Sequence, residues 1–110
     1  MASTRIAGAH LAIMLAVLAL QFPATAQAQP ASDAGRRLYA SCAGCHGTEG
    51  RPAEGSSLPP LAGQSRDALA ASMKAFREGS RPATIMHQLA KGYTSEQIDL
   101  IAAYLADLKK

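Results

Sequence analysis

Residues 42–46 read Cys-Ala-Gly-Cys-His, in which two cysteines are separated by two residues and followed directly by a histidine. Two thiols separated by two residues can add to the two vinyl groups on one edge of a porphyrin. The residue that follows then lies beneath the ring, where its imidazole can reach the iron. Cys-x-x-Cys-His is the usual pattern of covalent haem attachment. We therefore predict one covalent haem held by Cys42 and Cys45, with His46 as an iron ligand.

The cysteine pair has three other interpretations. A thioredoxin-like redox pair would need a βαβ context, and the sequence has no strand pattern. A zinc site could combine both cysteines with His46 and His87, but the adjacent Cys45 and His46 are poorly spaced for one tetrahedron. A structural disulfide would close a very small loop and leave His46 without a role. The pentapeptide therefore favours haem.

The first 28 residues have the pattern of a secretory signal peptide. Arg5 supplies a positive charge, residues 6–20 are almost wholly apolar, and two Ala-x-Ala cleavage sites end at Ala26 and Ala28. A retained membrane anchor is the alternative, but a spanning helix needs about 20 apolar residues and this run is shorter. We predict cleavage of residues 1–28, export to the periplasm, and no stable membrane insertion afterwards.

The mature chain, residues 29–110, would have 82 of the 110 residues and form one domain. A domain of this size is marginal for a self-sufficient core and usually needs disulfides, a metal or a cofactor. A buried haem would supply the missing core. The full chain has a net charge of +3, and its basic residues are scattered. This pattern predicts neither a nucleic-acid partner nor a polybasic membrane patch.

The rest of the mature sequence predicts an all-α domain. Four helices are expected, over residues 32–43, 65–79, 82–90 and 94–108, with a loop rich in glycine and proline over 44–64. Ser32, Ser65 and Thr94 are the expected N-terminal caps, and Thr94 with Gln97 has the pattern of a capping box. Apolar stripes are expected at Leu69, Met73 and Phe76, and at Ile98, Ile101, Leu105 and Leu108.

The segment GRRLYASCAGCHG, residues 35–47, resembles the first helix and haem site of class I cytochromes c. The resemblance covers essentially the whole mature chain. It implies the class I cytochrome c fold, with about four helices around one covalently bound haem. It also implies that Gly35 and Tyr39 pack closely against the last helix, near Tyr104.

The second iron ligand must come from Met73, Met86 or His87. Met73 lies on a regular apolar stripe, and LAASMKAFREGSR resembles the middle helix of cytochromes c4, where this position is ordinary packing. Met86 lies in TIMHQLAKGYT, which resembles the family's ligand segment. Met86 is therefore the expected ligand. His87 is the alternative, and ligation by two histidines would give a lower potential than His/Met ligation.

Three more residues are implied to surround the haem. SLPPLAGQ, residues 57–64, resembles a Pro-x-Leu pattern, with the Pro59 carbonyl accepting from the ligating imidazole and Leu61 lying against the porphyrin. Pro60, in the middle position, could shift this register. Arg81 is a candidate partner for a haem propionate, and the alternative is a solvated surface arginine.

The segment TIMHQLAKGYT, residues 84–94, in which Lys91 to Thr94 lead into the last helix, looks most like the monohaem cytochrome subunit of flavocytochrome c, a sulfide dehydrogenase. The resemblance implies an electron-transfer protein that accepts electrons from a flavoprotein subunit and performs no bond chemistry itself. A permanent partner would leave an apolar patch around the haem edge. The alternatives are a free-standing cytochrome of the c4 or c5 type that serves a terminal oxidase or reductase, and a haem sensor or peroxidase with an open sixth position.

Overall fold

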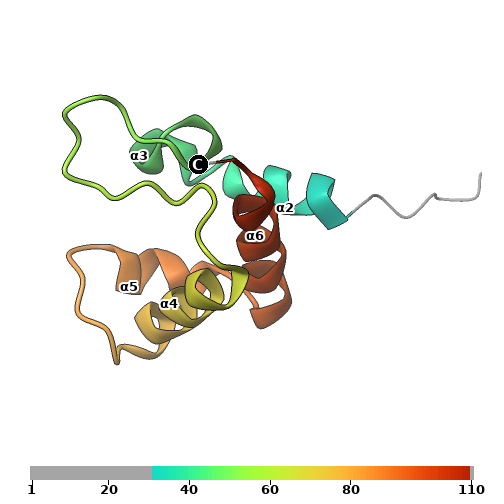
Figure 1. The fold of residues 1–110 in the computed structure, drawn as a ribbon. Coiled ribbons are helices and arrows are strands. Elements are labelled where there is room, and N and C mark those ends of the chain that lie inside the picture. Colours follow the sequence, from blue (N-terminus) through green and yellow to red (C-terminus); the bar gives the residue numbers. More distant parts are fainter. Residues whose placement is uncertain (1–30, 110) are drawn as a thin grey trace, which may run out of the picture.

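The computed structural model describes residues 31–109, and within this range the chain is all-helical, without strands (Figure 1). The predicted signal peptide lies outside the described residues. Five α-helices and two 3₁₀ turns follow one another along the chain: α2 (Ala31–Tyr39), α3 (Ala43–His46), η1 (Thr48–Gly50), α4 (Arg66–Glu78), α5 (Met86–Leu89), η2 (Ala90–Gly92) and α6 (Ser95–Asp107). The predicted fold class is confirmed. In this part of the chain no helix is both long and apolar enough to span a membrane.

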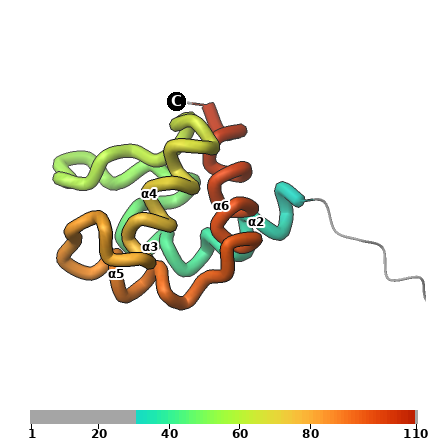
Figure 2. Tube along the Cα trace, turned by 90° about the horizontal axis from the view of Figure 1, so that it is seen from below, coloured from blue at the N-terminus to red at the C-terminus, as the bar shows by residue number. Residues whose placement is uncertain are grey.

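The N-terminal and C-terminal helices of the described range, α2 and α6, pack directly against each other, and both views show them side by side (Figures 1 and 2). Gly35 is buried at the crossing, where an added Cβ would collide with the Leu100 carbonyl oxygen and lie 2.8 Å from the Tyr104 Cβ. One turn further on, the rings of Tyr39 and Tyr104 are 5.8 Å apart. The expected packing of Gly35 and Tyr39 near Tyr104 is therefore confirmed.

Helix α6 supplies most of the core. Thr94 and Gln97 form the predicted capping box, in which each side chain accepts from the other's backbone N–H. This exchange satisfies donors that the first turn of a helix leaves unpaired. The predicted stripe is buried except for Leu108, which packs against the core from its edge. The buried cluster comprises Tyr39, Leu69, Ala70, Ile98, Ile101, Ala102, Tyr104 and Leu105.

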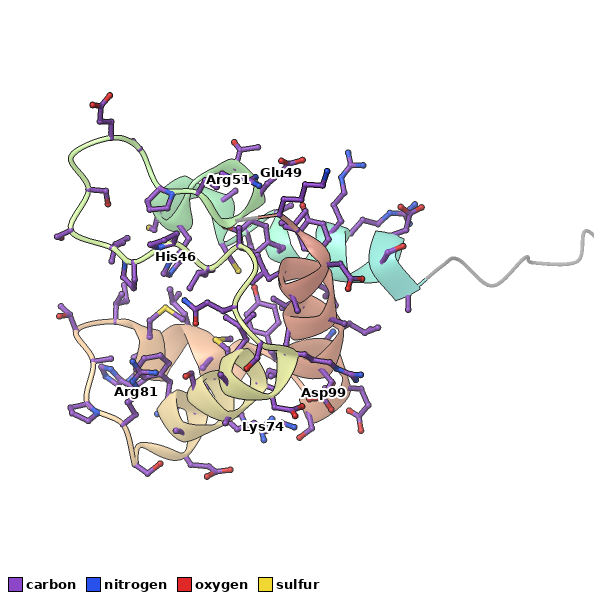
Figure 3. All side chains as sticks on the ribbon, viewed as in Figure 1. His46, Glu49, Arg51, Lys74, Arg81 and Asp99 are labelled. Atoms are coloured by element: carbon purple, nitrogen blue, oxygen red, sulfur yellow. The ribbon has the colours of Figure 1, made fainter. Side chains whose placement is uncertain are left out.

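Helix α4 has the limits that its end signals predict. The Ser65 side chain accepts from the Ala68 N–H, and Gly79 ends the helix in the left-handed conformation, with φ 78°. Lys74 on α4 donates to Asp99 on α6 over 2.8 Å, and Figure 3 shows this pair between the two helices. Capping thus sets the length of α4, and this ion pair joins α4 to α6.

The structure corrects the predicted first helix, which ends earlier than expected and is followed by a separate short helix. Helix α2 ends at Tyr39, and a tight turn in which the Cys42 N–H donates to the Tyr39 carbonyl precedes α3. The attachment motif therefore forms its own four-residue helix inside the predicted loop, and the described chain has five α-helices where about four were expected. Ser32 lies within the first turn of α2 and is not its cap.

The predicted third helix is also shorter than expected. Residues 82–85 are not helical, and Ile85 has φ −138°, outside the helical region, so α5 begins only at Met86. The chain uses residues 79–85 to return from the end of α4 toward the middle of the molecule (Figure 1). Pro82 is compatible with a helix start, but here it belongs to this connection.

Candidate functional site

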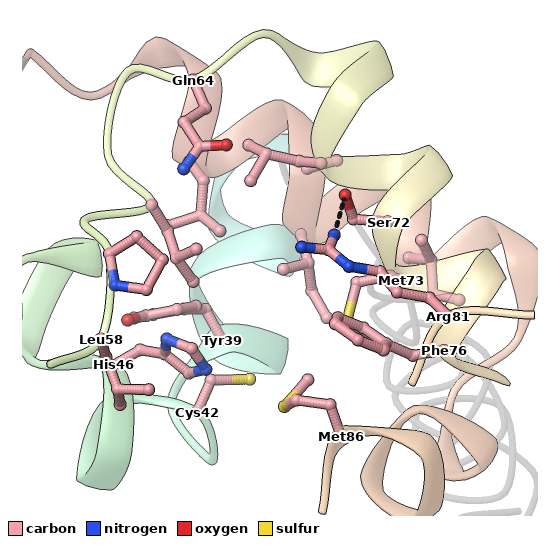
Figure 4. Close-up of a pocket in the computed structure, with 17 residues that line it drawn as sticks. Tyr39, Cys42, His46, Leu58, Gln64, Ser72, Met73, Phe76, Arg81 and Met86 are labelled. Carbon is pink, nitrogen blue, oxygen red and sulfur yellow. Dashed lines mark hydrogen bonds between the residues drawn. The ribbon is translucent and has the colours of Figure 1, made fainter. Parts of the chain in front are cut away.

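A cavity of about 250 Å³ lies at the centre of the fold, and its lining comes from every helix from α2 to α6 and from the segments before and after α4 (Figure 4). Six of the seven predicted site residues line this cavity: Cys42, His46, Pro59, Leu61, Arg81 and Met86. Cys45 does not line it and is exposed. The apolar wall is formed by core residues such as Leu69, Ile98 and Leu105, so one cavity combines the hydrophobic core with the predicted site.

Tyr39 forms a hydrogen bond with the end of the attachment segment. Its hydroxyl donates to the Gly47 carbonyl over 2.7 Å, and burial raises the pKa of this phenol. Cys42 is partly buried, and neither it nor Cys45 forms a disulfide. Both sulfurs are therefore present as thiols, the form that adds to vinyl groups. In the range 31–109, no three His, Cys, Asp or Glu side chains gather as a metal-ligand cluster, so the four-ligand zinc arrangement is not formed.

The His46 imidazole is suited to metal ligation. Burial lowers its pKa, which favours the neutral ring that binds metals. Its Nδ1 atom is buried and has no hydrogen-bond partner. The hydrogen bond predicted to the Pro59 carbonyl is thus not made in this structure, although Pro59 lines the same cavity. The next carbonyl, that of Pro60, accepts from the Gln64 side chain over 2.7 Å.

Two methionines face the cavity. Met86 is the first residue of α5 and lines the cavity across from His46 and Cys42 (Figure 4). Met73 also lines it, from α4, and packs against the buried core cluster, as its place on an apolar stripe predicts. His87 follows Met86 on α5 but is not part of the lining. The cavity therefore offers two thioether sulfurs, one from the core helix α4 and one from α5.

Two contacts that the sequence does not predict hold Arg81 at the cavity. Its Nη1 donates to the Ser72 Oγ over 2.7 Å, and its guanidinium lies 4.6 Å from the centre of the Phe76 ring (Figure 4). Ser72 and Phe76 are four residues apart on α4 and so lie on one face of the helix. This spacing is the sequence signal that could have indicated that both side chains contact the same partner. This arrangement gives the cavity a positively charged group at its edge.

The residues present fit a covalent haem. The cavity combines an apolar wall, a thiol, an imidazole with an unpartnered buried nitrogen, a thioether sulfur across from that imidazole, and a guanidinium. The fold and the site together define a small all-helical haem-binding domain. The comparisons with known proteins identify the family.

The cytochrome c family matches residues 32–109. The chain is 45% identical over 76 residues to the cytochrome subunit of sulfide dehydrogenase from Chlorobaculum tepidum, covering 69% of this chain and 67% of that protein. It is 32% identical over 109 residues to a thiosulfate dehydrogenase electron acceptor from Stutzerimonas stutzeri, covering 88% of this chain. The solved structure of cytochrome c4 from Pseudomonas stutzeri superposes with a TM-score of 0.66 and 26% identity, over 72% of this chain.

The chain belongs to the cytochrome c family. It is an electron-transfer protein with one covalently bound haem c, as the Cys-x-x-Cys motif at Cys42 and Cys45 implies in this family. The chain spans 50% of the length of the thiosulfate dehydrogenase electron acceptor and 48% of that of the cytochrome c4 chain.

Proposed function

We propose that this protein is a periplasmic one-electron carrier whose iron is ligated by His46 and Met86, and that it accepts electrons from a sulfide-oxidising flavoprotein subunit. One observation carries the ligation: His46 and Met86, from distant parts of the sequence, line one cavity on facing segments, with Cys42 beside the imidazole (Figure 4). The signal-peptide pattern of residues 1–28 supports export.

Each site residue has a distinct role in this proposal. When bound, the haem supplies an iron that exchanges one electron without breaking a bond in any substrate. Cys42 and Cys45 would hold the porphyrin by thioether bonds, while His46 and Met86 would both ligate the iron. A filled sixth position favours electron transfer over the sensor or peroxidase alternative, which needs an open one.

The other predicted site residues would surround the porphyrin, orient the His46 ring and pair with a propionate. Leu61 lies in the apolar wall, partly buried against the core, and would exclude water from the porphyrin face. The Pro59 carbonyl would accept the Nδ1–H of His46 and fix the ring's orientation, as partners of ligating histidines generally do. Arg81, held by Ser72 and Phe76, would pair with a propionate carboxylate.

The flavoprotein partner is supported by sequence similarity and by the surface. The relative of 45% identity is the cytochrome subunit of a sulfide dehydrogenase. In the described chain the exposed large hydrophobic residues are Leu58, Ile85 and Leu89. Leu58 lines the cavity, and Ile85 immediately precedes Met86, so exposed apolar side chains flank the proposed haem site. Apolar exposure of this kind is typical of lasting interfaces.

The ligation is tested by comparing Met86→Ala with Met73→Ala in the oxidised holoprotein. Methionine ligation gives a weak charge-transfer band near the red end of the visible spectrum. We expect Met86→Ala to abolish this band, while Met73→Ala, a matched removal of a thioether from the same cavity, keeps it. Loss of the band in Met73→Ala alone would assign the ligand to α4 instead.

The partner is tested separately by isolating the native holoprotein. We expect it to co-purify with a flavoprotein subunit and to be reduced when sulfide is added to the complex. A free-standing c4- or c5-type carrier is the second candidate, favoured by the similarity to cytochrome c4 and to the thiosulfate dehydrogenase electron acceptor. A lone monomer that reduces a terminal oxidase or reductase and shows no sulfide-dependent reduction would support this second candidate and contradict the first.

A further inference from the structure

We propose that a hydrogen bond between Tyr93 and Ser41 holds the Met86 segment against the haem-attachment segment, so that these two hydroxyls are positioning groups for the sixth iron ligand. The inference rests on the proposed ligation by Met86. Ser41 and Tyr93 lie beside the attachment motif and at the end of the ligand segment, but neither is among the residues expected to bind the haem.

The hydroxyl oxygens of Tyr93 and Ser41 are 2.5 Å apart, although 52 residues separate them in the sequence. The Ser41 hydroxyl also donates to the Leu38 carbonyl over 3.2 Å. Since a serine hydroxyl has only one proton, Tyr93 must be the donor to Ser41. The result is a chain of two hydrogen bonds from Tyr93 through Ser41 to the end of α2.

Both ends of this chain are connected to the site. Ser41 directly precedes Cys42, and its Oγ lies 4.0 Å from the Cys42 sulfur. At the other end, the Tyr93 N–H donates to the carbonyl of Ala90, which is fully buried and follows α5. The Tyr93 carbonyl accepts from the Arg77 Nη1 over 3.3 Å. Tyr93 is therefore held to α4 and to the end of the Met86 segment while its hydroxyl reaches Ser41.

The two ligand-bearing helices need such a connection. Helices α3 and α5 have four residues each, and neither has a side-chain cap. A helix of this length is not stable by itself, so its position must come from tertiary contacts. In Figure 1, α3 lies on one side of the central loops and α5 on the other. The Tyr93–Ser41 bond joins the segments that carry these two helices.

The test uses Tyr93→Phe, Ser41→Ala and the double variant, each as the oxidised holoprotein. Imidazole binds the iron only when the methionine has left it, so the imidazole-binding rate measures how often the Met86 segment opens. We expect either single variant to bind imidazole about two- to tenfold faster, the range that a net hydrogen-bond contribution gives. The double variant should match the singles, because both changes remove the same interaction.

Tyr104→Phe is the matched control, since it removes the same hydroxyl from a tyrosine outside the cavity lining. It should bind imidazole at the native rate. A native rate in both Tyr93→Phe and Ser41→Ala, or additive effects in the double variant, would overturn the proposal. Retention of the charge-transfer band in Met86→Ala would instead refute the ligation itself, so the two failures are distinguishable. A lower temperature for loss of the band than for global unfolding should accompany the faster binding.

Discussion

The close crossing of α2 and α6 can be tested by the substitution Gly35→Ala. The new Cβ would meet the Leu100 carbonyl oxygen, the Leu100 carbonyl carbon at 3.0 Å and the Tyr104 Cβ at 2.8 Å. Two of these three atoms are backbone, so no flexible side chain can move aside and the helices must separate. Overpacking of this kind costs about 1–3 kcal/mol. We take about 3 kcal/mol because of the backbone contacts, and alanine's better helix propensity offsets about 1 kcal/mol.

The expected net loss of about 2 kcal/mol in the free energy of unfolding should lower the melting temperature of the holoprotein by about 8–16 °C, the scale for domains of this size. Thermal unfolding followed by far-ultraviolet circular dichroism measures it. Gly92→Ala is the control, because a Cβ at Gly92 meets nothing within 4 Å and should leave the melting temperature nearly unchanged. A melting temperature for Gly35→Ala equal to that of the control would refute the reasoning that this crossing limits the approach of the two helices.

Three further predictions concern charge and the cofactor. The hydrogen bond from Lys74 lowers the pKa of Asp99, so the pair stabilises the fold above the ordinary carboxyl pKa and loses this effect as the pH falls through the lowered value. Lys74→Met should therefore reduce the melting temperature at pH 7, and this reduction should shrink as the pH falls below the ordinary carboxyl pKa and Asp99 becomes protonated. Arg81→Gln should lower the reduction potential measured by redox titration, because a positive charge beside the haem favours the reduced state. Cys42→Ser with Cys45→Ser should give no compact protein, and a cooperative melt of such an apoprotein would contradict a haem-filled core.

The long helices were predictable because their signals are local. Ser65 and Gly79 mark the ends of α4, and the capping box at Thr94 marks the start of α6, each through a hydrogen bond or a backbone angle that depends on near neighbours. The attachment motif was predictable for a different reason, since two thiols and an imidazole at that spacing have few other uses. Gly35 and Tyr39 were placed correctly by resemblance to the family, and the structure gives the physical reason in the crossing with α6.

The short elements could not be predicted from local signals. The turn between α2 and α3 is closed by a hydrogen bond from the Cys42 N–H to the Tyr39 carbonyl. No capping or helix-breaking residue at positions 40–42 predicts this turn. The start of α5 depends on Ile85, whose backbone lies outside the helical region. The partners of Arg81 and Ser41 are determined by tertiary packing, which a periodicity pattern does not describe.

The proposed iron ligands lie on the short helices of the fold, not on the long capped ones. The elements with caps, α4 and α6, carry the buried core and the ion pair, while α3 and α5, which carry His46 and Met86, are uncapped and four residues long. Local opening is expected where buried contacts and helix length are smallest. The proposed ligands are therefore carried by the helices that are least stable in isolation, and these helices depend on connections such as the Tyr93–Ser41 hydrogen bond to keep their positions. It follows that loss of the Met86 ligand should precede unfolding of α6, because the connection can break while the core remains packed.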